Sequence, residues 1–208
     1  MKKLVLVLTL FLSFLSFESY SQFLHAYGAT IGVTRANQIW TIKPFNFHET
    51  NYRTGFNGSL FLEFFNHDVF TWVMEAQFNQ KGTRFTDVDN ALLSKSRANY
   101  ACFNNFLKAR TEGIDINLYI LGGPRIEYLI SGRGPLPYNQ LHFSLSGGLG
   151  CDFNYLEPLI LFTEIHYNPD ITHSAAESMK HRAFELKVGI KKKINTARFN
   201  DPCPPVFL

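Results

Sequence analysis

Alternation of apolar and polar residues is the dominant pattern along this chain. From residue 141 onward, Leu141, Phe143 and Leu145 occupy every second position, and small or polar residues such as His142 and Ser144 lie between them. Because successive side chains of a strand point to opposite faces, this period predicts a strand with one apolar and one polar face. The same reasoning predicts eight strands, at roughly residues 26–36, 56–66, 69–82, 98–110, 114–130, 140–154, 158–169 and 181–193.

The connections between these strands alternate in length. Tight turns lie near residues 66–68, 111–113 and 156–157, and longer connections span 37–55, 83–97, 131–139 and 171–180. An even number of antiparallel strands with short turns at one rim and long loops at the other is typical of outer-membrane barrels. A secreted soluble barrel that binds an apolar ligand also alternates, but its apolar face points inward.

Residue size favours an apolar face that points outward. The interior of an eight-stranded barrel is only just wide enough for side chains, and this chain carries 21 phenylalanines in 208 residues. The face opposite the large apolar residues is mainly Ser, Gly and charged residues. We therefore predict an all-β, eight-stranded antiparallel up-and-down transmembrane β-barrel. Interfacial aromatic girdles are predicted at Phe70, Trp72 and Tyr155 near the turns, and at Tyr100, Tyr128 and Tyr167 near the loops.

The N-terminal segment has the layout of a secretory signal peptide. Met1-Lys2-Lys3 precedes an apolar run, and small residues follow at Ser19 and Ser21. We predict a signal peptide at 1–21, a barrel domain at 22–194 and a tail at 195–208. Export and an even strand number predict an outer-membrane protein with both termini in the periplasm.

Composition narrows the classes of partner. A net charge of +3 without a basic cluster gives no indication of nucleic-acid binding. Cys102, Cys151 and Cys203 are widely spaced and do not indicate a disulfide scaffold or a zinc site. We expect a monomer surrounded by outer-membrane lipid, without a cofactor, that contacts an envelope protein through its long loops.

Gly147-Gly148-Leu149-Gly150 is the densest glycine cluster in the chain. A phosphate-binding loop must open into a helix, whereas here the strand alternation continues to Tyr155. We expect these glycines to let a curved strand bend and to relieve crowding inside a narrow barrel.

Five segments of the predicted strands carry a family resemblance: MEAQFNQKG (74–82), YACFNNFLKAR (100–110), LGGPRIEYLIS (121–131), EIHYNPDIT (164–172) and FELKVGIKKK (184–193). In this order they resemble successive strands of the PorT-like outer membrane β-barrel family of Bacteroidetes. The residues that recur in that family are here Glu75, Gln80-Lys81-Gly82, Gly123-Pro124 and Glu164, whereas Asn104 and Asn105 depart from its pattern. The resemblance implies the barrel fold and the outer-membrane location, and one member of the family acts in protein secretion.

Inward-facing polar residues are the candidates for chemistry. His142 and Ser144 resemble the His-x-Ser of outer-membrane lipid A deacylases, which makes a lipid-modifying hydrolase the alternative function. By alternation both residues face the lumen, so a non-catalytic structural or interaction role is preferred, and no metal-ligand spacing is present. The predicted lumen network, in which opposite charges pair and fill the barrel, comprises Glu75, Lys81, Asp115, Arg125, Glu127, Asp152, Glu164, His166, Glu185 and Lys187, and Glu63 is assigned inward by the same alternation.

Overall fold

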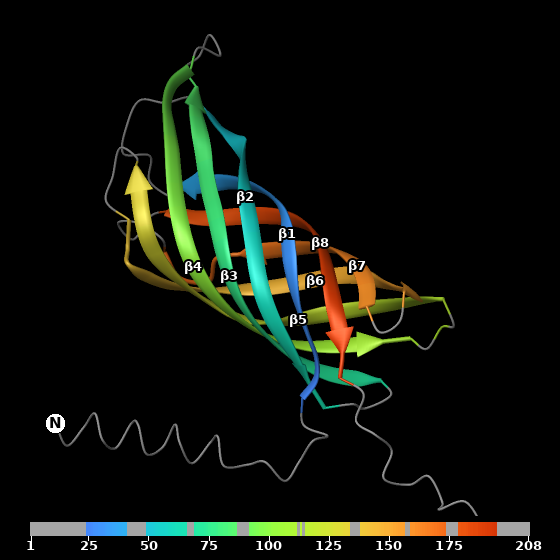
Figure 1. The fold of residues 1–208 in the computed structure, drawn as a ribbon. Coiled ribbons are helices and arrows are strands. Elements are labelled where there is room, and N and C mark those ends of the chain that lie inside the picture. The colour runs from blue at the N-terminus through green and yellow to red at the C-terminus, as the bar shows by residue number, and fades with distance from the viewer. Residues whose placement is uncertain are drawn as a thin grey trace, which may run out of the picture.

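Eight antiparallel strands close into one barrel (Figure 1). Each strand pairs with its neighbours in the chain, and β8 pairs with β1 to complete the closure, as the alternation predicted. The computed structural model describes residues 24–40, 49–65, 69–86, 92–111, 113, 115–133, 138–156, 159–173 and 179–194. The strands are β1 (Leu24–Trp40), β2 (Glu49–Phe64), β3 (Phe70–Thr86), β4 (Leu92–Arg110), β5 (Ile116–Arg133), β6 (Leu141–Leu156), β7 (Leu159–Pro169) and β8 (Met179–Lys193).

The strands run farther toward the long-loop rim than the alternation predicted. β1 continues to Trp40 and β2 begins at Glu49, so much of the predicted connection 37–55 is strand. β3 and β4 likewise include much of 83–97, and these two strands reach far up in Figure 1. Both faces of these extensions carry polar residues. The sequence therefore shows no clear alternation of apolar and polar residues there, and the prediction ended the strands too early. Polar contacts such as Thr83 Oγ1 to Asn37 Oδ1, at 2.7 Å, join the extensions instead.

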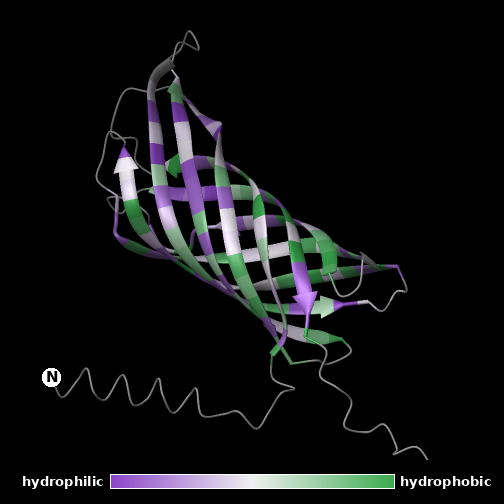
Figure 2. Cartoon of the chain, in the orientation of Figure 1, coloured by the Kyte–Doolittle hydropathy of each residue, from purple (hydrophilic) through white to green (hydrophobic). Residues whose placement is uncertain are grey.

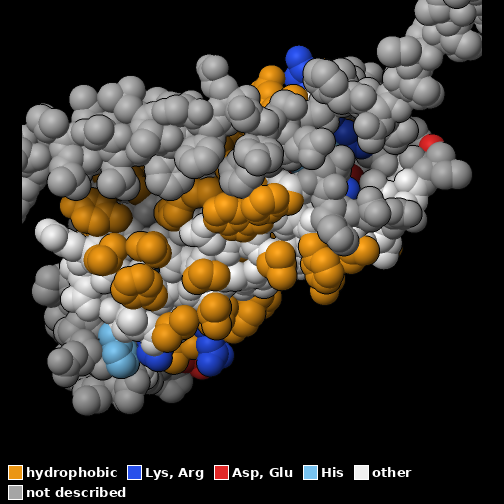
Figure 3. All heavy atoms as spheres, turned by 90° about the horizontal axis from the view of Figure 1, so that it is seen from below, with side chains coloured by type: hydrophobic (Ala, Val, Ile, Leu, Met, Phe, Trp, Pro, Cys, Tyr) orange, Lys and Arg blue, Asp and Glu red, His pale blue; other side chains and the backbone are white. Residues whose placement is uncertain are grey.

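Large apolar side chains cover the outer wall of the barrel. Ile31, Leu60 and Leu149 are each more than 60% exposed, at 66%, 68% and 64%. Figure 2 shows apolar and polar positions alternating along the strands, and Figure 3 shows many apolar side chains on the face of the wall that is turned to the viewer. Within the described residues, no helix has the length and hydropathy that a membrane crossing requires.

The aromatic girdles are only partly as predicted. Phe70, Tyr128 and Tyr167 are exposed on the outer wall. Tyr100 is fully buried, because it lies on the inward face of β4 together with Cys102 and Lys108, whereas the girdle prediction considered only its place near the loops. The Tyr155 side chain, the predicted signal peptide 1–21 and the predicted tail 195–208 lie outside the described residues.

The lumen also contains an apolar layer, which the sequence did not predict. The layer is formed by Phe61, Val73, Phe106, Tyr119, Leu121 and Phe162. Glycines make room for three of its rings: a Cβ would lie 2.6 Å from Phe61 at Gly28, 2.4 Å from Tyr119 at Gly150, and 2.3 Å from Phe162 at Gly189. The narrow barrel therefore accepts large rings where the facing strands have no side chain.

Candidate functional site

A four-residue charge cluster lies in the lumen toward the rim of the short turns. Lys108 Nζ lies 3.1 Å from Glu63 and 3.5 Å from Asp152. Lys191 Nζ lies 3.2 Å from Glu63 and 2.7 Å from Asp152, so two cations and two carboxylates share one cluster. Lys108 also lies 3.6 Å from the centre of the Tyr119 ring, where the ring face attracts a cation. The cluster joins β2, β4, β6 and β8 across the barrel.

A second cluster crosses the middle of the lumen. Lys187 Nζ on β8 lies 2.8 Å from Glu75 Oε1 on β3, and both side chains are buried. Asn104 donates to Glu75 at 2.7 Å, which satisfies another lone pair of that carboxylate. Glu185 accepts hydrogen bonds from Gln77 and Asn79, at 2.9 Å and 2.7 Å. These bonds offset part of the cost of placing charges inside the barrel.

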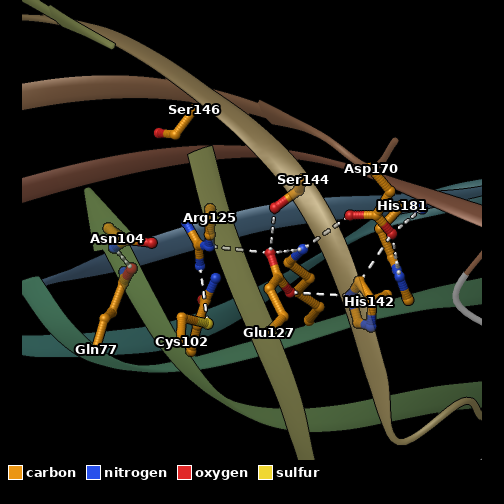
Figure 4. A network of polar contacts seen from close by, with 12 residues as sticks. Gln77, Cys102, Asn104, Arg125, Glu127, His142, Ser144, Ser146, Asp170 and His181 are labelled. Carbon is orange, nitrogen blue, oxygen red and sulfur yellow. Dashed lines mark hydrogen bonds and ion pairs between the residues drawn. The ribbon is translucent and has the colours of Figure 1, made fainter. Parts of the chain in front are cut away.

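Arg125 connects the middle cluster to the part of the lumen nearer the long loops (Figure 4). Its Nη1 donates to Glu185 at 2.9 Å, its Nη2 donates to the Cys102 sulfur at 3.2 Å, and its Nε lies 2.9 Å from Glu127. Glu127 also lies 2.8 Å from Lys81 Nζ. One guanidinium thus links carboxylates on β5 and β8.

Glu164 belongs to a smaller group of residues from β5, β6 and β7. Its carboxylate lies 2.8 Å from His166 Nε2 and accepts the Tyr119 hydroxyl at 2.8 Å. Ser146 Oγ lies 3.3 Å from the other nitrogen of His166. The partners of Glu164 are therefore hydrogen-bonding groups rather than a directly bonded lysine or arginine.

Two histidines and a carboxylate meet near the long-loop rim. Asp170, which lies just beyond β7, has Oδ2 3.2 Å from His181 Nδ1 and 3.9 Å from His142 Nε2. The three ligand atoms lie within 4.8 Å of one another, a spacing that could hold a metal ion and that sequence spacing did not predict. Lys81 already supplies a positive charge there, 3.3 Å from Asp170 Oδ1.

The ionisation of Asp170 follows from these neighbours. Burial raises the pKa of its carboxyl, but Lys81 and the hydrogen bond with His181 outweigh burial and hold that pKa below its usual range. The carboxylate is therefore charged at neutral pH and pairs with Lys81.

Polar side chains cover this group at the rim. Gln38 Nε2 lies 3.2 Å from His181 Nε2 and donates to Ser96 and to the Tyr138 hydroxyl, each at 3.1 Å. Ser96 and Tyr138 are themselves hydrogen-bonded. The rings of Tyr100 and His142 make an edge contact at 4.9 Å between centroids. The upper lumen is thus filled by contacts between opposite walls.

The structure brings most of the predicted lumen residues together, with one exception. Glu75, Lys81, Arg125, Glu127, Asp152, Glu164, His166, Glu185 and Lys187 all make contacts within the lumen. Asp115 does not, and its assignment was wrong: β5 begins only at Ile116, so Asp115 is exposed in the turn and its carbonyl accepts from the Asn154 N–H at 2.9 Å.

Four charged or ionisable members were missing from the predicted network. Lys108 and Lys191 follow the inward alternation of β4 and β8, so the strand period already contained their signal. His181 also follows the phase of β8. Asp170 lies beyond the end of β7, where no alternation indicates its direction.

The arrangement of His142 and Ser144 does not form a nucleophile–base pair. Ser144 Oγ donates to Glu127 Oε1 at 2.9 Å, and His142 Nε2 lies 3.2 Å from Glu127 Oε2. The same carboxylate therefore binds both residues, and the serine is 1% exposed. An activated serine requires a base within hydrogen-bond reach and access to its substrate.

Comparisons with known proteins agree with this architecture. OprG from Pseudomonas aeruginosa has a TM-score of 0.55 at 10% identity, over 83% of this chain and 97% of OprG. Neisserial surface protein A has a TM-score of 0.52 at 13% identity, over 81% of this chain and 99% of that protein. AlkL, solved in lipid bilayers, has a TM-score of 0.52 at 9% identity, over 86% and 95% of the two chains. At these identities the likeness shows the fold alone.

Sequence comparison supplies the family. No curated protein matches the chain. The family model described as outer membrane protein beta-barrel domain matches residues 20–176, which is most of the chain. The closed barrel with its apolar outer wall agrees with that description. The chain therefore belongs to the family of outer membrane protein beta-barrel domains.

Proposed function

We propose that this protein is a non-catalytic outer-membrane barrel with a structural or interaction role, in which the lumen serves as a filled core. The observation that carries the proposal is the pairing of lumen charges from wall to wall. Lys187 with Glu75 and Lys191 with Asp152 are buried pairs at 2.8 Å and 2.7 Å, and each joins strands from different parts of the wall. Because these charges pair with one another inside a narrow eight-stranded barrel, they do not require hydration by a water-filled channel.

Conductance measurements test the filled lumen. Folded protein inserted into a planar lipid bilayer should give no stepwise ion current, because Arg125, Glu127 and Lys81 block the passage together. A porin of known conductance in the same bilayer is the positive control. Reproducible current steps that depend on protein concentration would contradict a filled lumen.

The proposed orientation places the long-loop rim outside the cell and both termini in the periplasm. Short turns at the periplasmic rim and longer extracellular loops are the usual arrangement of such barrels. Residues near the long-loop rim, such as the exposed Asn139, would then be available to an envelope partner. The protein is proposed to be monomeric, since barrel closure leaves no open sheet edge among the described strands.

A photo-crosslinking residue introduced at Asn139 tests the interaction role. In intact cells this variant should give a discrete protein adduct, whereas the same residue at the exposed Thr111, on the short-turn rim, should not. Adducts of equal yield and size from both positions would show contact without preference for the long-loop rim and would count against the proposed role.

Within the family, we propose that the chain is PorT-like. The segments that carry the resemblance fall on β3, β4, β5, β7 and β8 in the order expected. Lys81 and Glu164, which recur in those segments, both lie in lumen contacts here. A secretion-associated role would follow from this kinship, and it is tested by whether deletion of the gene lowers the yield of secreted proteins.

A further inference from the structure

A group of cations on the outer wall forms no ion pair in the described part of the chain. We call this group the basic patch: it consists of Arg53 on β2, Arg84 on β3, Lys95 and Arg97 on β4, and Arg133 on β5. Four of the five side chains are exposed and Arg53 is half-buried. None of them lies in an ion pair with a described carboxylate, whereas every lysine and arginine of the lumen clusters has one.

Strand register places like charges directly opposite one another in the basic patch. Arg84 pairs with Lys95 across β3 and β4. Arg97 pairs with Arg133 across β4 and β5. Like charges in directly opposite positions destabilise a sheet when nothing lies between them. An anion bound between them would convert this repulsion into attraction.

Arg53 adds a further charge to the same area. Its Nη1 donates to the carbonyl oxygen of Ser96 at 2.6 Å, so its guanidinium reaches across β3 to β4. It crosses above Gly82, where a Cβ would lie 3.0 Å from the Arg53 Cδ. Gly82 pairs with Arg97, and Arg53 therefore ends beside Arg97. The absence of a side chain at Gly82 lets three cations gather on this part of the wall.

On the same strands, the basic patch lies nearer the long-loop rim than the apolar part of the outer wall does. Along β3, the outward residues change from Phe78 to Gln80 and then to Arg84, and along β4 they change from Phe103 to Asn99 and then to Arg97. Toward the long-loop rim, the outward residues are thus first apolar, then polar and uncharged, and finally cationic. A phosphorylated lipid has the same order, with acyl chains below and phosphates above.

We infer that the basic patch binds the phosphate groups of a phosphorylated lipid in the outer leaflet, while the acyl chains of that lipid lie on the apolar wall of β3 and β4. Guanidinium groups suit this ligand because they can donate two hydrogen bonds to one phosphate. The inference rests on the orientation proposed above, in which the long-loop rim lies in the outer leaflet. It assigns a ligand to the outer wall rather than to the lumen.

Native mass spectrometry of the folded protein in a non-ionic detergent tests the inference. The probes are diphosphorylated lipid A, its monophosphorylated form and dioleoylphosphatidylcholine. The parent protein should bind lipid A best. The double variant Arg97→Gln/Arg133→Gln should lower that affinity by at least about tenfold, because charge-assisted hydrogen bonds to phosphate are lost. The free energy of unfolding of this double variant in phosphatidylcholine should not fall, because the two like charges that face each other are both removed.

The matched control removes two charges at the same rim on the opposite side of the barrel. Lys180→Gln/Arg182→Gln on β8 should leave lipid A affinity unchanged. Equal losses in both double variants, or equal binding of lipid A and phosphatidylcholine by the parent, would overturn the inference. Displacement of lipid A by an equimolar amount of inorganic phosphate would also overturn it, because the patch would then recognise an anion and not a lipid. Protease mapping on cells that places this rim in the periplasm would reject the proposed orientation. The binding measurement uses purified protein, so a failure of the proposed function can be told apart from a failure of lipid A binding.

Discussion

Tyr119 on β5 and Gly150 on β6 are direct cross-strand partners, and the tyrosine ring occupies the space that a side chain at residue 150 would fill. A Cβ at Gly150 would lie 2.4 Å from the ring, well inside van der Waals contact. The ring cannot move without loss, because its hydroxyl donates to Glu164 at 2.8 Å and its face lies against Lys108. The glycine thus supports the apolar layer and two polar clusters at once.

We predict that Gly150→Ala destabilises the barrel by about 1–3 kcal/mol, the usual cost of overpacking a filled interior. Gly147→Ala on the same strand is the matched control, because a Cβ there would meet no atom of the described residues within 4 Å. That change should be neutral or stabilising by up to about 1 kcal/mol, since alanine restricts the unfolded chain. Denaturant unfolding in lipid vesicles measures both values. Equal effects of the two variants would show that Tyr119 does not confine residue 150.

The fold was predictable because strand period and residue size are local properties. Leu149 outside and Asp152 inside follow from the alternation of one strand. The contacts inside the lumen are not local: Lys187 reaches Glu75, and nothing in either segment indicates that β8 and β3 meet through the interior. Asp170 illustrates the same limit. It lies beyond the end of β7, so strand alternation does not indicate whether its side chain points inward or outward.

Closure of the barrel predicts resistance to cold detergent. Because β8 pairs with β1 and no described strand is left as an edge, the protein should migrate differently on gels before and after boiling. It should also partition with outer membranes and require detergent to dissolve, since residues such as Leu60 and Ile165 are exposed on the wall. A detergent-free, monodisperse monomer recovered from the periplasm would instead support a soluble barrel.

The proposed orientation predicts which positions a protease can reach. A cleavable tag inserted after Asn139, at the long-loop rim, should be cut when protease is added to intact cells. A tag placed after Leu208 should be cut only after the outer membrane is opened. Immunoblots of both tagged proteins before and after permeabilisation make this comparison. Cleavage of the C-terminal tag on intact cells is the result that rejects the orientation.

The pair between Lys187 and Glu75 should be among the most sensitive parts of the lumen. Glu75→Leu leaves the Lys187 ammonium without its nearest partner, and removal of one member of a buried pair typically costs about 3–5 kcal/mol. The double variant Glu75→Leu/Lys187→Met should recover much of that loss, since both charges are then absent. Unfolding in lipid gives the coupling between the two positions. A double variant whose loss equals the sum of the single losses would show that the pair is not coupled.

Glu164→Leu should cost less than Glu75→Leu, although both carboxylates lie in the lumen. Glu164 accepts from Tyr119 and contacts His166, so its loss leaves unsatisfied hydrogen-bonding groups rather than a lysine or arginine without its bonded partner. Unsatisfied buried groups typically cost about 1–3 kcal/mol each. Leu161→Ile, on the outer wall of the same strand, is the control and should change stability by less than about 1.5 kcal/mol. Parallel unfolding curves in the same lipid rank the three variants. If Glu164→Leu proves as costly as Glu75→Leu, Glu164 must compensate Lys187 or Lys108 through the lumen, and the clusters then act as one electrostatic network.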